Sequence, residues 1–422
     1  MTFSVLGTDI FGQPITLNQS ERRQGTYIIG ATGTGKSTLV ENLIMQDIDQ
    51  HIGVGVLDPH GDLINRVIER IDPRRLSDVI LLDIANQDFP FGLNLYECKA
   101  PQDDLEVQRT VNRVMHIFDR LYEVNLGTPQ MSYYFRNCTH TIIANQGFTM
   151  AEIPLLLTDE AFRRRLLANV KNRTVLRFWG EYEKVEKNRF QYLREVHPIL
   201  NKLDAFLHPL LENIVGHATS TLDFPQIMDE RKILLVRLDR QLEDMTTLVG
   251  SVIIAQILNA ALAREKIIPT KRKQFNLYVD EFQRFATKDL AVLLTEARKY
   301  GLATTIAHQA RYQEGMNQEN RVASLTASNL MVFRVSDADA KELFGNFDTR
   351  PLAQPPEEIG IEEIRTPVKD VVHHLLNSGS HPNDVVNQFA TQVLPVCNTD
   401  PDMKGIYKDH SLLKNSIVEL IV

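Results

Sequence analysis

The stretch Gly30-Ala-Thr-Gly-Thr-Gly-Lys-Ser-Thr38 fits the phosphate-binding pattern G-x-x-x-x-G-K-[ST]. A short apolar run, Tyr27–Gly30, precedes the stretch, and the amphipathic segment Ser37–Asp49 follows it. Average residue frequencies give only about 0.02 chance matches in a chain of this length. The alternative is a glycine-rich turn that binds no ligand. The sequence predicts a strand, a nucleotide-binding loop and a helix.

The residues expected to bind the cofactor are Gly30, Ala31, Thr32, Gly33, Thr34, Gly35, Lys36, Ser37 and Thr38. Glycines let the backbone N–H groups turn inward around phosphates, and the helix N-terminus adds its positive end. Lys36 is expected to reach the β- and γ-phosphates, and the Ser37 hydroxyl to ligate Mg²⁺. ATP and Mg²⁺ are therefore the expected cofactors.

Apolar strands alternate with helices over much of the chain. Further strands are expected at Val54–Leu57, Asp78–Leu82, Ile233–Leu238, Phe275–Val279, Leu302–Ala307 and Leu330–Val335, and further helices at Leu63–Arg70, Leu248–Arg264 and Leu290–Tyr300. Several of these strands are continuous apolar runs, which are typical of strands covered on both faces. The alternation predicts an α/β fold, with a mostly parallel sheet wrapped by helices.

One segment, 103–225, lacks a convincing strand and is instead helical and charged, for example at Val107–Tyr122 and Ala161–Val170. We predict a short N-terminal β segment (1–24), a nucleotide-binding core (25–102 and 226–350), a helical insertion (103–225), and a linker with a C-terminal tail (351–422). Residues 161–202 carry 11 Lys or Arg against 4 Glu, a net charge of +7. If Arg163–Arg165 and neighbouring cations contact DNA phosphates, their neutralisation should weaken DNA binding. The alternative is a solvated charged face.

Composition narrows the class of protein. With 43% hydrophobic and 24% charged residues, the chain is neither wholly disordered nor collagen-like nor a coiled coil. A net charge of −8 argues against a simple basic nucleic-acid binder, but not against a local basic surface. We expect no membrane helix and no signal peptide. Three cysteines far apart in the sequence favour the reducing cytoplasm.

Two adjacent acids, Asp280 and Glu281, end the apolar strand Phe275–Val279. The carboxyl end of a parallel strand faces the ligand crevice. Asp280 is expected to hold Mg²⁺, and Glu281 to act as the general base toward water. The alternative is a solvated strand end. Gln309 would lie beside the γ-phosphate if its strand neighbours that of Asp280; otherwise it is a loop glutamine.

Five motifs in order resemble the HerA/FtsK superfamily of P-loop ATPases. They are GATGTGKST, LDPHGDL (Leu57–Leu63), VDEFQRF (Val279–Phe285), EARKYGL (Glu296–Leu302) and AHQ (Ala307–Gln309). The resemblance covers about 25–102 and 226–350, and is closest to HerA-like helicases and TraG/TraD-type conjugative coupling proteins. It implies a RecA-like ATPase core that works as a ring, usually a hexamer, and that moves DNA. It also implies that 103–225 is the counterpart of the helical insertion of coupling proteins.

The resemblance also implies roles for single residues. Lys36 and Ser37 take the phosphate-loop roles, Asp280 the metal role, Glu281 the water-activating role and Gln309 that of a polar sensor. Arg298 lies where coupling proteins place the arginine that reaches a neighbour's ATP, and Arg334 is a second candidate. The alternative for Arg298 is a cation that suits a helix end. Asp58 matches a family acid to which the sequence assigns no role.

The expected function is that of an ATP-hydrolysing DNA translocase or helicase in the cytoplasm. About 25 residues precede the phosphate loop, so we expect neither the β-barrel domain of HerA-like helicases nor the membrane helices of coupling proteins. Two alternatives stay open. One is the same motor moving protein, as in secretion ATPases. The other is an ATP-dependent scaffold for a partner effector such as a nuclease.

Overall fold

The computed structural model of the chain describes residues 3–9, 12–121, 129–207, 209–285, 288–312, 316, 318–345 and 417–418. The predicted linker and tail, 351–422, lie outside the described residues except for the two-residue strand β10 (Ile417–Val418).

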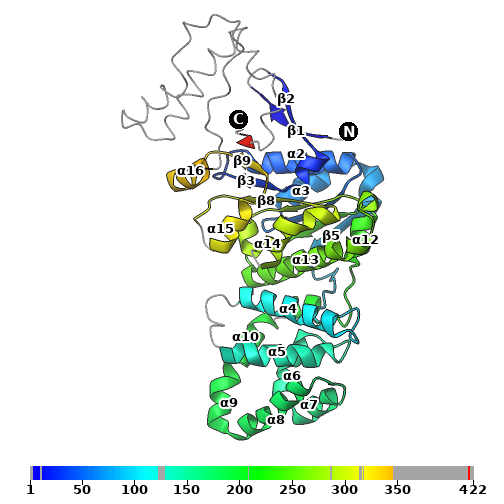
Figure 1. Cartoon of the computed structure of the whole chain (residues 1–422), viewed down its shortest axis with the longest axis vertical. Coiled ribbons are helices and arrows are strands. Elements are labelled where there is room, and N and C mark those ends of the chain that lie inside the picture. The colour runs from blue at the N-terminus through cyan, green and yellow to red at the C-terminus, as the bar shows by residue number, and fades with distance from the viewer. Residues whose placement is uncertain are drawn as a thin grey trace, which may run out of the picture.

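A parallel sheet of eight strands forms the centre of the molecule, in the order β10-β9-β3-β8-β7-β4-β6-β5 (Figure 1). The strands besides β10 are β3 (Thr26–Ile29), β4 (Gly53–Asp58), β5 (Val79–Asp83), β6 (Ile233–Arg237), β7 (Phe275–Val279), β8 (Leu302–His308) and β9 (Asn329–Val332). All seven predicted strands are therefore present. Every residue of β3, β4, β7 and β8 is buried, because helices cover both faces of the sheet.

One face of the sheet carries α2 (Lys36–Asp49) and α3 (Asp62–Arg70). An antiparallel hairpin of β1 (Phe3–Thr8) and β2 (Pro14–Asn18) follows the N-terminus and leads into α1 (Gln19–Arg22). The hairpin lies against α2, where the Gln46 side chain bonds both the N–H and the C=O of Val5. This hairpin agrees with the short β segment that the sequence predicts.

The opposite face carries α12 (Phe224–Asp229), α13 (Glu243–Ala263), α14 (Lys288–Glu296) and α15 (Gln318–Ser324), while α16 (Asp337–Phe344) follows β9 (Figure 1). Among the described residues, one stretch, Glu243–Lys266, is long and apolar enough to cross a membrane by length and composition alone. In the fold, 78% of its apolar window is buried, because α13 lies against the sheet.

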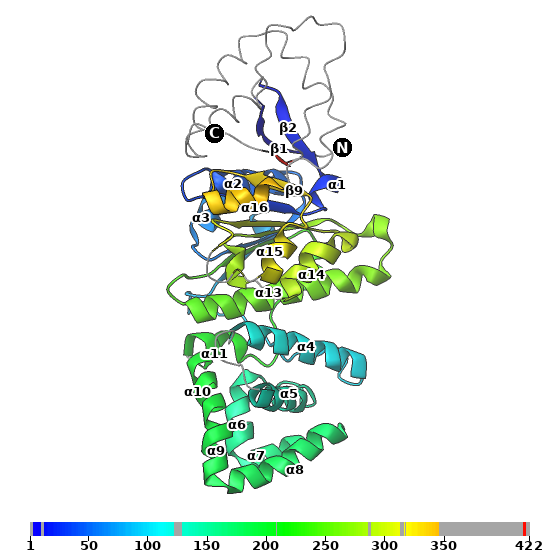
Figure 2. The same cartoon turned by 60° about the vertical axis from the view of Figure 1, so that its left-hand side comes forward.

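The described residues between β5 and β6 contain no strand. Their helices are α4 (Asp104–Leu121), α5 (Pro129–Ile143), α6 (Ile153–Thr158), α7 (Glu160–Leu167), α8 (Arg173–Lys187), α9 (Arg189–Glu195), α10 (His197–Phe206) and α11 (Pro209–Val215), before α12. Figure 2 shows α4 beneath α13, α5 below α4, and α7, α8 and α9 together at the end of the molecule farthest from the sheet. The core and insertion boundaries given above stay a prediction that agrees with this arrangement.

Arg163 corrects the expectation that all of Arg163–Arg165 could contact DNA phosphates, because it alone of the three is buried. Its side chain is 1% exposed, and its guanidinium pairs with Glu186 at 2.5 Å and lies 5.0 Å from the ring centroid of Tyr182. The neighbouring Arg164 pairs with Glu160 one helical turn away. Arg163 therefore belongs to the core of the helical region and cannot contact DNA phosphates.

Candidate active site

The glycine-rich loop joins β3 to α2 at the carboxyl edge of the sheet. Gly35 caps α2 with a φ of 103°, a conformation that favours glycine. A Cβ atom on Gly30 would lie 2.4 Å from Cβ of Phe333, the residue that follows β9 and backs the loop. The Ala31 N–H donates to the Arg334 carbonyl at 2.7 Å. The loop is thus held from behind by the segment after β9.

Lys36 lies inside the curve of this loop. Its Nζ donates to the carbonyls of Gly30 (2.6 Å) and Ala31 (3.2 Å). Burial lowers the pKa of Lys36, and the charges of Glu281 and Asp280 act in the opposite direction. A buried ammonium bonded only to carbonyls can exchange them for phosphate oxygens, so its position fits a bound nucleotide.

Three acids meet beside Lys36 at the ends of the neighbouring strands β4 and β7. They are Asp58, Asp280 and Glu281. Burial, then the charges of Glu281 and Asp58, raise the pKa of Asp280 to about 7, while Lys36 lowers it. Glu281 has a φ of 45°, which is uncommon for a non-glycine residue, and is 6% exposed. Carboxyl groups this close together disfavour one another's ionisation, so a nearby cation is needed for all three to be ionised.

The structure gives Asp58 a role that the sequence left open. Its carboxylate accepts the N–H groups of His60 (2.8 Å) and Ile64 (3.1 Å). It thereby fixes the turn between β4 and α3, and it also supplies negative charge next to Asp280.

Gln309 connects the acidic pair with the phosphate loop. Because β8 lies between β3 and β7, the condition that the sequence set for Gln309 is met. Its Nε2 donates to Glu281 Oε1 at 2.9 Å, and its Oε1 accepts from the Thr32 hydroxyl at 3.0 Å. Gln283, two residues after Glu281, donates to the other carboxylate oxygen at 2.7 Å. Sequence reasoning missed Gln283, whose only signal was its place within the VDEFQRF motif.

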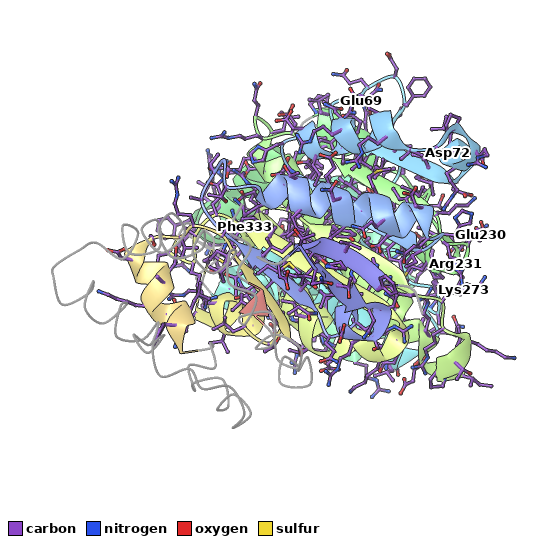
Figure 3. All side chains as sticks on the ribbon, turned by 90° about the horizontal axis from the view of Figure 1, so that it is seen from above. Glu69, Asp72, Glu230, Arg231, Lys273 and Phe333 are labelled. Carbon is purple, nitrogen blue, oxygen red and sulfur yellow. The ribbon has the colours of Figure 1, made fainter. Side chains whose placement is uncertain are left out.

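The two candidate arginines lie at opposite ends of the strands: Arg334 follows the carboxyl end of β9, and Arg298 precedes the amino end of β8. Arg334 is exposed and its backbone contacts the phosphate loop. Arg298 is exposed in the 3₁₀ turn Ala297–Tyr300, before β8 begins. Figure 3 shows Phe333, the residue before Arg334, near one end of α2, and Lys273, just before β7, at the other side of the molecule. A seven-residue strand such as β8 spans about 23 Å, so Arg298 lies far from its own loop.

The oxygens at this edge fit a magnesium ion that is shared with a nucleotide. Ser37 and Asp280 offer one hydroxyl and one carboxylate. Mg²⁺ is usually bound through one or two protein ligands together with phosphate oxygens and water. Among the described residues, no group of three or more His, Cys, Asp or Glu side chains has the arrangement of a self-contained metal site. The hydroxyl and carboxylate that Ser37 and Asp280 offer fit Mg²⁺ bound together with ATP.

Comparison with known proteins decides the family. A family model described as the central domain of the helicase HerA matches residues 14–260, which is more than half of the chain. The chain belongs to the HerA family. No match was found among curated proteins. This HerA-family chain is a P-loop ATPase.

Solved structures show the same RecA-like fold. The plasmid coupling protein TrwB in complex with ADP and Mg²⁺ is 17% identical, with a TM-score of 0.54 over 78% of this chain and 74% of that one. TrwB in a trigonal form with sulphate is also 17% identical, with a TM-score of 0.55 over 80% and 76%. VirB4 of Thermoanaerobacter pseudethanolicus is 14% identical, with a TM-score of 0.54 over 81% and 87%.

Proposed function

We propose that this HerA-family ATPase forms a ring that uses ATP hydrolysis to move DNA. The observation that carries the proposal is the chain of contacts from Thr32 through Gln309 to Glu281. It links the loop that binds phosphate to the carboxylate that can activate water, as a hydrolytic motor requires. The described cysteines, Cys98 and Cys138, are buried free thiols, which supports a cytoplasmic location.

ATP and Mg²⁺ are the cofactors, and when bound they supply the bond that is cleaved and the charge that stabilises its products. Lys36 binds the phosphates, while Ser37 and Asp280 hold the metal. Glu281 takes a proton from the attacking water. The amide groups of Gln309 and Gln283 orient the Glu281 carboxylate. The cofactors that accompany TrwB, ADP and Mg²⁺, support this assignment.

The position of Arg298 supports an active site that is shared between subunits. It lies about one strand length from its own phosphate loop, so it can reach only the ATP of a neighbouring subunit. A head-to-tail contact of this kind closes into a ring rather than a two-fold dimer. We propose a hexamer in which Arg298 acts across the interface. Arg334 lies beside its own loop, and we keep it as the reserve candidate.

The outer helices offer a revised DNA surface. Lys187 and Arg189 are exposed at the junction of α8 and α9, and neither makes an ion pair within the described part of the chain. The neighbouring Phe190 is 76% exposed. Cations bind phosphates without regard to sequence, and an exposed aromatic ring can stack on a base. This surface, Lys187–Phe190, replaces Arg163–Arg165 as the proposed contact.

The experiment is steady-state ATP hydrolysis with no DNA, with duplex DNA and with single-stranded DNA, at low and high salt, alongside the assembled mass. We expect a ring whose ATPase activity rises with DNA, and whose affinity for DNA falls steeply with salt. Turnover that ignores DNA but changes with an added protein would instead indicate a protein motor. Rings with negligible turnover would indicate a scaffold for an effector, such as a nuclease.

A further inference from the structure

A fully buried arginine, Arg311, lies two residues beyond the sensor Gln309. Its side chain is 0% exposed. One terminal nitrogen donates to the hydroxyls of Ser324 (3.0 Å) and Tyr27 (3.2 Å). The other donates to the Arg321 carbonyl and to Glu342 Oε1, each at 2.9 Å. A single guanidinium thus ties β3, α15 and α16 to the segment that follows β8.

The backbone of the same residue is fixed as well. The Arg311 N–H donates to Asp339 Oδ1 at 2.9 Å, and the other oxygen of Asp339 accepts from Ser336. Asp339 is itself 1% exposed. Main chain and side chain of Arg311 are therefore both anchored to α16, which holds the segment just after Gln309 in one place.

An aromatic layer lies between Arg311 and the active site. The Tyr27 hydroxyl lies 2.5 Å from His308 Nε2, and the ring of Phe282 lies 4.8 Å from that of His308 and 6.2 Å from that of Tyr27. His308 directly precedes Gln309, and Phe282 directly follows Glu281. Tyr27 lies on the strand that enters the phosphate loop. Each member of the layer is thus linked through the backbone to a functional part of the site.

Arg311 is positively charged, whereas His308 in the aromatic layer is neutral. Burial, together with the charges of Arg311 and Lys36, lowers the pKa of His308 to about 3, so the imidazole is neutral at physiological pH. Glu342 faces the guanidinium and its pKa is lowered by that hydrogen bond. A buried ion pair is often no more stabilising than apolar side chains of similar size. What a guanidinium adds is several directed donors in a fixed plane.

We propose that Arg311 is a positioning residue for ATP hydrolysis, which aligns Gln309 with Glu281 by fixing the chain around the end of β8. The inference rests on the proposed function, since it assumes that Glu281 and Gln309 carry out hydrolysis. The hydrogen bonds of Arg311 go to Tyr27, to α15 and to α16, and none goes to the nucleotide loop, Asp280 or Glu281. It acts through the segment it holds, and not on the reacting atoms.

The test is a double-mutant cycle on kcat with Arg311→Lys and Gln309→Ala. Lysine keeps the charge but cannot reach all four acceptors of the Arg311 guanidinium, which are three side-chain oxygens and the Arg321 carbonyl. We expect Arg311→Lys to lower kcat by about tenfold to a hundredfold, as for the loss of a hydrogen bond to a charged group. The Kd of a non-hydrolysable ATP analogue should change by less than about threefold. In the Gln309→Ala background, Arg311→Lys should lower kcat by less than about threefold, because the residue it positions is gone.

Arg163→Lys is the matched control. Arg163 is also a buried arginine that pairs with a glutamate and lies over a tyrosine ring, but it belongs to α7 in the outer helices. The Arg163→Lys substitution should lower the stability of the protein and leave kcat, measured without DNA, unchanged. If Arg311→Lys does not fold, the cycle is run with Glu342→Gln, because the Glu342 side chain is 29% exposed and tolerates change better.

Two results would overturn the inference. One is an equal loss of kcat in both backgrounds, which is what a purely structural role produces. The other is a folded Arg311→Lys variant with normal kcat. A wild-type protein without ATPase activity would overturn the proposed function and this inference together. Additive losses in an active wild type would reject the inference alone.

Discussion

Asp280 carries a stability cost that its own substitution should remove. The pKa of its carboxyl rises from 3.8 to about 7, through burial and the charges of Glu281 and Asp58. The folded protein therefore binds more protons than the unfolded chain between these values, so the free energy of unfolding falls as the pH rises through this window. At about 1.4 kcal/mol per pH unit the full cost above pH 7 is about 4 kcal/mol. Because Asp280 keeps some contact with solvent, we expect about 2 kcal/mol.

The assay is urea unfolding of wild type and Asp280→Asn without nucleotide or Mg²⁺, followed by circular dichroism. The variant should be more stable by about 2 kcal/mol at pH 8, and its advantage should shrink by about half at pH 5.5. Asp88→Asn, an exposed acid in the loop after β5, is the control and should change little at either pH. An Asp280→Asn variant no more stable than wild type at pH 8, or an advantage independent of pH, would refute the reasoning.

The active site and the outer helices give three further predictions. Lys36→Ala should weaken nucleotide binding, whereas Glu281→Gln should bind ATP and lose turnover. Near-normal turnover in Glu281→Gln would show that Glu281 is not the general base. Arg298→Ala and Lys36→Ala should each be inactive alone, yet mixed rings should recover partial ATPase activity, because some interfaces then pair an intact loop with an intact arginine. No recovery in rings shown to be mixed would reject the shared site. Neutralising Lys187 and Arg189 together should weaken DNA binding alike for all sequences and make the slope of log affinity against log salt less negative by about 2; an unchanged slope would return this surface to an ordinary solvated face.

Local sequence patterns predicted the nucleotide-binding half of the molecule well. Consecutive residues form the strand before the loop, the loop itself and α2. Their structure can therefore be predicted without knowledge of contacts between distant segments. The position of the acidic pair could be predicted for the same reason, since a buried parallel strand that ends in two acids brings them to the carboxyl edge. The link from Gln309 to Glu281 depends on the order of the strands in the sheet, which sequence patterns alone do not determine.

Contacts between distant segments were beyond this kind of reasoning. Arg163 was expected on the surface because charged residues usually are, but α8 brings Tyr182 and Glu186 over it. Arg311 stood out in no motif, because its partners come from α15 and α16, later in the chain. Similarly, α13 is long and apolar because it is buried against the sheet, and this burial can be seen only in the assembled fold.

The proposed function is movement along DNA, and displacement of a third strand from a triplex measures this movement. Wild-type protein with ATP and Mg²⁺ should displace the third strand when a duplex or single-stranded flank lets it load, and Glu281→Gln should bind the same DNA without displacing it. ATP hydrolysis by wild type with no displacement on any flank would contradict the account.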